Sequence, residues 1–192
     1  MKAVIKKDYG PYELEYTEIP KPVVGENDVL IKVKAAAICG SDLGLYYDTV
    51  EGKTVDYPIV IGHEFAGEIC ETGKNVTRWK KGDRVVSDNT GYVCGECYAC
   101  GSGEYLFCSH RKGMGNDMDG GFAEYVKIPG QVLQAFPNCL YRIPDNAEFE
   151  DAAMMDPCCN GYKAVIQEGG LLPGQNVVVF GAGALGLFSM IA

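Results

Sequence analysis

The stretch IGHEFAG, residues 61–67, places the imidazole of His63 and the carboxylate of Glu64 directly before an apolar segment. That segment, residues 65–71, is expected to form a strand that ends at Gly73. The chain has only two histidines, so a histidine at the head of a strand is a candidate metal ligand. The alternative interpretation is a buried structural histidine beside a surface glutamate.

The stretch AICGSD, residues 37–42, supplies a second candidate ligand, because Cys39 ends a predicted strand over residues 29–38. A thiolate and an imidazole are ligands that zinc prefers. We therefore expect Cys39 and His63 to share a zinc ion, with Glu64 adding a carboxylate.

Short segments that alternate apolar and polar side chains recur through the first three quarters of the chain. Many short strands separated by turn residues are typical of a barrel or sandwich-like β domain. A short helix is expected over residues 42–47, and a polar surface loop over residues 48–58. The predicted strands cover residues 2–7, 12–18, 29–38, 65–71, 84–87, 121–128 and 140–143.

Four of the nine cysteines form the pattern C-x2-C-x2-C-x7-C. Four thiolates at this spacing can close a tetrahedron around zinc and leave no open position, so the site is expected to be structural. The ion would order the glycine-rich lobe 88–120, which is long and shows little apolar periodicity. The alternatives are free or disulfide-bonded cysteines, or an iron–sulfur cluster. The four residues are Cys94, Cys97, Cys100 and Cys108.

The pattern changes after Pro144, where residues 148–155 and 159–168 are predicted to be helices. The continuous apolar run at residues 176–180 is typical of a parallel strand that is buried on both faces. The stretch GAGALG, residues 181–186, follows it and opens another predicted helix.

A strand, a G-x-G-x-x-G turn and a helix in this order indicate a dinucleotide-binding unit. Gly181 would permit the tight turn, Gly183 the approach of a pyrophosphate, and Gly186 close packing of helix on strand. The alternative is a glycine-rich turn that only packs a helix on a strand. The acidic residue that distinguishes NAD from NADP would fall beyond Ala192, so the choice between them is not readable.

Asp156 is the candidate for a further ligand at the Cys39 and His63 site. It stands in the stretch MMDPCCNG, residues 154–161, beside apolar side chains, where an acidic group is expected to have a partner. Other interpretations are a helix cap or a surface carboxylate. Cys158 and Cys159 are competing ligands.

Composition limits the function. At 192 residues with a net charge of −9, the chain is a poor candidate for binding nucleic acid or an anionic membrane. No segment has the length of a membrane span, and the N-terminus lacks an apolar signal core. An odd number of cysteines without a signal peptide argues against a disulfide framework. A soluble, cytoplasmic protein is expected.

These motifs together resemble the zinc-dependent medium-chain alcohol dehydrogenase family, especially its polyol (sorbitol-like) and threonine dehydrogenase branches. The resemblance rests on CGSD at residues 39–42, GHE at 62–64 with Gly67 and Gly73, and GDRV at 82–85, followed by the four-cysteine lobe and the glycine-rich turn. It implies a mainly β fold with some α. A GroES-like catalytic domain over residues 1–155 would precede the truncated first βα unit of a Rossmann domain over residues 156–192.

The resemblance also assigns roles to residues. It implies Cys39, His63 and Asp156 as ligands of a catalytic zinc, because Asp156 stands five residues before Gly161, as the family's third ligand does before a helix-opening glycine. Glu64 would be a fourth ligand or lie just behind the metal. Ser41 would start a proton relay, and Asp42 would orient the ligand histidine. The implied cofactor-binding residues are Gly181, Gly183, Leu185, Gly186 and Asn160.

The activity implied is hydride transfer between a secondary alcohol, such as a polyol, and NAD or NADP, with two zinc ions per chain. A homo-oligomer acting on a small molecule, without nucleic acid or membrane partners, is expected. The resemblance covers the N-terminal part of the family's pattern only, so we expect a truncated chain whose activity belongs to its parent protein. The competing hypothesis is a zinc-stabilised, non-catalytic binding module.

Overall fold

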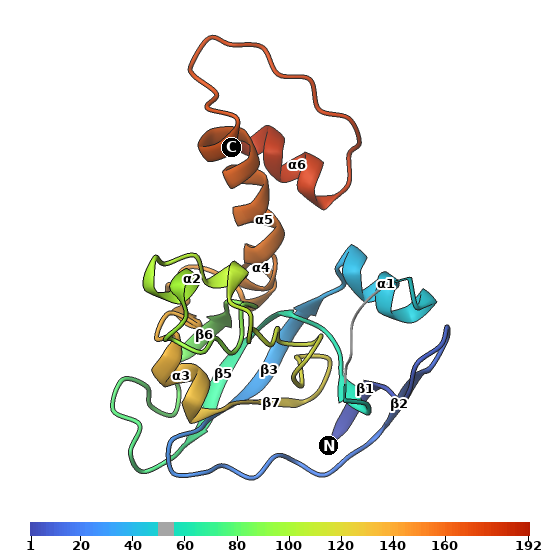
Figure 1. The fold of residues 1–192 in the computed structure, drawn as a ribbon, viewed down its shortest axis with the longest axis vertical. Coiled ribbons are helices and arrows are strands. Elements are labelled where there is room, and N and C mark those ends of the chain that lie inside the picture. Colours follow the sequence, from blue (N-terminus) through green and yellow to red (C-terminus); the bar gives the residue numbers. More distant parts are fainter. Residues whose placement is uncertain (50–55) are drawn as a thin grey trace. The chain divides into compact units, whose positions relative to one another are not determined.

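The computed structural model describes residues 1–49 and 56–192. The chain divides into two compact units, Met1–Ala153 and Met154–Ala192, which are described separately (Figure 1). The domain limits expected from the sequence, 1–155 and 156–192, stay a prediction. The surface loop expected at residues 48–58 falls largely on residues 50–55, which lie outside the described residues.

The first unit is built on two antiparallel sheets, which confirms the predicted mainly β fold with some helix (Figure 1). The three-stranded sheet has the order β2-β1-β4, and the five-stranded sheet has the order β7-β3-β5-β6-β8. The strands are β1 (Lys2–Lys6), β2 (Leu14–Glu18), β3 (Val29–Ala37), β4 (Ile59–Val60), β5 (Glu64–Thr72), β6 (Arg84–Ser87), β7 (Tyr125–Ile128) and β8 (Leu140–Arg142).

The main core lies on one face of the five-stranded sheet. Val29 and Ile31 of β3 and Phe65 and Ile69 of β5 are almost completely buried in it. Complete burial of one such side chain contributes roughly 1.5–3 kcal/mol. This packing fixes β3 against β5, the two strands whose ends carry the candidate metal ligands.

Five short helices complete the first unit as described, over residues 1–49 and 56–153. They are α1 (Gly40–Tyr47), α2 (Tyr98–Gly101), the 3-10 turn η1 (Tyr105–Phe107), α3 (Gly130–Ala135) and α4 (Phe149–Ala153). The sequence predicted α1 and α4 but not α2, η1 or α3. Those three have only three to six residues each, too few for a helical period to be visible.

The second unit contains α5 (Met155–Tyr162), the π-helical segment η2 (Lys163–Glu168) and α6 (Ala184–Ile191). The predicted strand at residues 176–180 is wrong: in the part of the chain that the structure describes, no other segment pairs with it. Val178 and Phe180 are 77% and 95% exposed. A strand is stabilised by pairing with neighbours, and an apolar run alone does not provide them. Across residues 1–49 and 56–192, no helix combines the length and apolar character needed to span a membrane.

Candidate metal centres

The register of β3 and β5 brings the first candidate ligands together. The two strands are antiparallel and pair Ala37 with Glu64, so the end of β3 lies beside the start of β5. Cys39 follows β3 by two residues, and His63 immediately precedes β5. Two segments more than twenty residues apart in sequence therefore meet at one edge of the sheet.

The Sγ of Cys39, a ring nitrogen of His63 and a carboxylate oxygen of Glu64 all lie within 4.8 Å of one another. His63 and Glu64 are each only 5% exposed, and Cys39 is half-buried. A thiolate, an imidazole and a carboxylate are a donor set that suits zinc. Asp156 lies in the first turn of α5, in the second unit, and its role as a further ligand stays a prediction.

Asp42 lies directly behind the candidate ligand His63. Its Oδ1 is 3.6 Å from His63 Nδ1, and both side chains are about 5% exposed or less. Neither atom has a hydrogen-bond partner among the described residues. The Asp42 carboxylate favours the His63 tautomer in which Nδ1 carries the proton. The other ring nitrogen, Nε2, then has a free lone pair for a metal. These two orphaned atoms therefore fit a metal ion on the opposite side of the imidazole.

The other oxygen of Asp42 fixes Cys39. Its Oδ2 accepts a hydrogen bond of 2.8 Å from the Cys39 backbone N–H at the start of α1. Burial raises the pKa of the Asp42 carboxyl, while the Cys39 amide, the His63 side chain and the Gly62 amide act in the opposite direction. One carboxylate thus positions two candidate ligands. Ser41, the proposed first member of a proton relay, is exposed next to it.

The backbone before His63 turns through a conformation that requires glycine. Gly62 has φ +88°, and a Cβ on it would lie 2.2 Å from Cδ1 of Phe122. Both the positive φ and the contact exclude an ordinary side chain. Packing of Phe122 on this turn therefore fixes the backbone conformation at Gly62, immediately before His63.

Two further glycines behind this turn were missed by the sequence reasoning. A Cβ on Gly115 or Gly120 would lie 2.5 Å or 2.0 Å from the carbonyl oxygen of Gly62. The available signal was the density of glycines over residues 113–121, which was interpreted only as part of the zinc lobe. These glycines allow the lobe to approach the His63 turn.

The second candidate centre is the four-cysteine cluster. The Sγ atoms of the four residues lie within 4.8 Å of one another, as a tetrahedral zinc site requires. The Cys94 sulfur is 3.6 Å from that of Cys108 and 3.9 Å from that of Cys100. These separations are far longer than a disulfide bond, and none of the nine cysteines, all of which lie within the described residues, forms a disulfide.

Backbone amides prepare this cluster for a cation. Hydrogen bonds from the Glu96 and Cys97 amides lower the pKa of Cys94 to about 6. Burial raises the pKa of Cys100 to about 12 in the absence of a metal. Cys94 thus favours the thiolate form, whereas burial keeps Cys100 a neutral thiol. A bound dication would cause the neutral thiol to lose its proton as well, because the ion compensates the added negative charge.

The lobe is also held by apolar packing, which the sequence did not predict. Val93 and Met114 are at most 1% exposed and belong to the main core. The ring of Tyr105 packs on Phe136 with centroids 5.0 Å apart. The lobe is therefore anchored in the main core, and Cys100 and Cys108 are themselves buried there.

In the second unit, the glycine-rich turn has the local geometry that its sequence predicts. Gly181 has φ +94°, and a Cβ on Gly186 would lie 2.1 Å from the Gly181 carbonyl oxygen. Gly183 caps α6, and Leu185 on the first turn of that helix is exposed. Asn160 donates from Nδ2 to the Asp156 carbonyl within α5. Cofactor binding by these residues stays a prediction.

Comparison with known proteins connects these features. The family described as the alcohol dehydrogenase GroES-like domain matches residues 25–138. A zinc-type alcohol dehydrogenase-like protein of Escherichia coli (strain K12), itself described as uncharacterized, is 45% identical, covering 99% of this chain and 53% of the relative. The sorbitol dehydrogenase of Halalkalibacterium halodurans is 40% identical over 98% of this chain and 52% of its own length.

Solved structures show the same fold. The crystal structure of galactitol-1-phosphate dehydrogenase from Escherichia coli superposes with a TM-score of 0.82 at 29% identity, covering 99% of this chain and 51% of that one. The chain spans about half the length of the curated relatives it matches.

Proposed function

The chain belongs to the alcohol dehydrogenase GroES-like domain family, and we propose that it carries the metal centre of a zinc-dependent oxidoreductase acting on a secondary alcohol with NAD or NADP. The observation that supports this most directly is the convergence of Cys39, His63 and Glu64 within 4.8 Å, backed by the orphaned pair of His63 and Asp42. In this proposal residues 1–155 form the catalytic domain, and residues 156–192 begin the dinucleotide-binding domain.

Charge balance favours a set of three ligands with one carboxylate. With Cys39 ionised, His63 neutral and Asp156 ionised, the ligand charges sum to −2 and offset a zinc dication. Glu64 would add a further negative charge and weaken the ion as a Lewis acid, so we assign it to a second, exchangeable position. Its burial beside His63 keeps it within reach of that position.

Zinc bound there would act as a Lewis acid that lowers the pKa of the substrate hydroxyl. The residues of the chain supply orientation and proton transfer. Asp42 holds the imidazole of His63 and the amide of Cys39 at the same time. Ser41, which is exposed at the start of α1, would accept the hydroxyl proton and pass it to solvent.

A polyol is the substrate class that we propose, because a sorbitol dehydrogenase is among the relatives with the highest identity. For the nicotinamide cofactor, the turn around Gly181 and Gly186 leads into the N-terminus of α6, which would face the pyrophosphate with unpaired amides. Leu185 and Asn160 are the remaining proposed cofactor contacts.

Zinc analysis of single variants tests the proposal. Wild-type chain should hold two zinc ions, Cys39→Ser and Cys97→Ser one each, and the two variants should lose different ions. In a chain that also carries a complete dinucleotide-binding domain, Cys39→Ser should abolish sorbitol oxidation with NAD, followed as NADH absorbance. Cys97→Ser should lower stability more than turnover per folded molecule.

Two outcomes would contradict the proposal. One is undiminished oxidation by the Cys39→Ser protein. The other is a single zinc ion per wild-type chain that is lost in Cys97→Ser and kept in Cys39→Ser, which would favour a non-catalytic module stabilised by its lobe.

A further inference from the structure

A cavity of about 460 Å3 lies in the first unit, and none of the proposed metal ligands lines it. It opens between the segment 19–23, which follows β2, and strand β7. Small-molecule sites commonly have volumes of about 300–1,000 Å3. The cavity is therefore large enough for a compact organic ligand.

The body of the cavity is apolar and has a stiff wall. Ile19 and Met118 contribute apolar surface, whereas the lining residues Val60 and Val126 are only 3% and 1% exposed. Pro20 and Pro22 form part of the same wall, and each fixes its own φ, so this segment has little freedom to collapse into the space. An apolar ligand group would displace water from a surface that is already formed.

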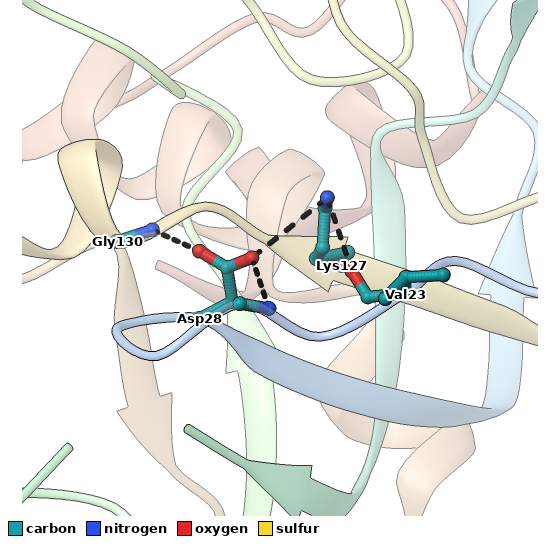
Figure 2. Close-up of polar contacts among 5 residues, drawn as sticks. Val23, Asp28, Lys127 and Gly130 are labelled. Atoms are coloured by element: carbon teal, nitrogen blue, oxygen red, sulfur yellow. Dashed lines mark hydrogen bonds and ion pairs between the residues drawn. The ribbon is translucent and has the colours of Figure 1, made fainter. Parts of the chain in front are cut away.

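Lys127 is one of the residues that line the cavity, and Figure 2 shows its ammonium group beside Val23 and Asp28. Lys127 Nζ donates to the Val23 carbonyl at 3.3 Å and lies 3.8 Å from Asp28 Oδ2. The Asp28 carboxylate already accepts backbone hydrogen bonds of 2.9 Å from Gly25 and 2.8 Å from Gly130, one on each oxygen. An ammonium has three donors, so Lys127 is held in place with donor capacity left over.

Lys21 supplies a second cation to the same cavity. Its Nζ lies 4.3 Å from the ring centroid of Tyr125, which also lines the space. Within residues 1–49 and 56–192, no carboxylate lies within 4.0 Å of this nitrogen, since Lys21 takes part in none of the ion pairs of the structure. The one lining carboxylate, Asp119, accepts the Val60 backbone N–H at 3.0 Å.

The cavity thus offers an apolar interior and the ammonium groups of Lys21 and Lys127, in a protein whose net charge is −9. The N-terminal ammonium of Met1, which also lines the cavity, donates to the Ile19 carbonyl at 2.6 Å. We propose that it is a binding site for a small amphiphilic anion, in which a carboxylate or phosphate monoester is held by Lys21 and Lys127 and an apolar chain or ring fills the body. The proposed redox function uses none of these residues, so the two proposals are tested independently of each other.

Titration of the zinc-loaded chain with octanoate tests the site, with binding followed by calorimetry and by the amide signals of Lys21 and Lys127. One octanoate per chain should bind, and Lys21→Met or Lys127→Met should each weaken it about tenfold, the loss expected for one charge-assisted hydrogen bond. Lys81→Met removes the same charge from an exposed turn outside the cavity and should leave the affinity unchanged.

Further probes identify the head group and the need for an apolar body. Octyl phosphate and octanoate should both bind if any anion suffices, and preference for one of them names the natural head group. Asp119→Asn, which removes the lining charge, should tighten both. Equal affinity for octanol and octanoate, or an octanoate affinity in both lysine variants that is unchanged from wild type, would overturn the proposal. So would the absence of octanoate binding at millimolar concentration.

Discussion

Replacing Asp42 by asparagine isolates the contribution of the carboxylate behind His63. The fold should tolerate this change, because an asparagine oxygen can still accept the hydrogen bond of 2.8 Å from the Cys39 amide at the start of α1. What is lost is the negative charge that faces His63 Nδ1 at 3.6 Å in a buried position. The substitution therefore leaves the candidate ligands present but weakens their support.

The expected magnitude follows from this geometry. Partners of metal-bound histidines typically contribute about 10- to 100-fold in metal affinity, which corresponds to about 1.4–2.7 kcal/mol. Because Asp42 Oδ1 and His63 Nδ1 lie 3.6 Å apart and neither has a hydrogen-bond partner among the residues described, no neighbouring group replaces the lost charge. We expect an effect within this range for zinc at the Cys39 and His63 site only.

The assay is competition for zinc against a chromophoric chelator, with the four-cysteine site in the same chain as the internal reference. Asp83→Asn is a matched control, because Asp83 is also buried and its Oδ2 lies 2.8 Å from Arg142, away from the metal ligands. Asp42→Asn should release the first zinc at a lower chelator concentration, and Asp83→Asn should not. Equal affinity in wild type and Asp42→Asn would refute the inferred tautomer and the metal position derived from it.

Three further outcomes are expected. Gly62→Ala should lower the free energy of unfolding by about 1–3 kcal/mol more than Gly82→Ala, because both glycines have positive φ but only at Gly62 would a Cβ meet Phe122; equal losses in urea unfolding would contradict this. Burial raises the pKa of Cys139 to about 12. In the unfolded chain the Cys139 thiol ionises at lower pH, so its contribution to the free energy of unfolding falls as pH rises above about 9 toward 12. The free energy of unfolding of Cys139→Ala should therefore decline less steeply over this pH range than that of wild type; parallel declines would exclude this role. Cys97→Ser should lower the thermal midpoint of the zinc-loaded chain and reduce the further drop in midpoint that a zinc chelator causes; an unchanged midpoint would show that apolar packing alone holds the lobe.

The strands and the convergence of Cys39 with His63 were predictable because their signals are short-range or repeat with a clear period. The alternation through β3 and β5 gives both strands directly, and antiparallel pairing of neighbours brings the end of one to the start of the other. Cys39 and His63 flank those ends in the sequence, so their convergence follows once the pairing is assumed. The role expected of Asp42, to orient His63, came only from the resemblance to the dehydrogenase family.

Other features depend on neighbours that the sequence does not name. Lys6 would be assigned to the surface from its type, yet it is completely buried and donates from Nζ to the Gly10 carbonyl at 2.7 Å. The two-residue strand β4 exists because residues 59–60 pair with β1, and it is too short to show a period. In both cases tertiary packing outweighs the local preference.

In the C-terminal segment, the features that depend on nearby residues are present, and the one that depends on distant strands is not. The positive φ of Gly181 and the close contact between Gly186 and the Gly181 carbonyl are both present, because they depend only on residues within the turn and its helix. The strand predicted at residues 176–180 is absent, because its hydrogen bonds must come from other strands. An apolar run therefore forms a strand only where other strands are present to pair with it, whereas the conformation of a glycine turn is set by the residues of the turn itself. Val178 and Phe180 are accordingly exposed, because no segment of the described chain covers them.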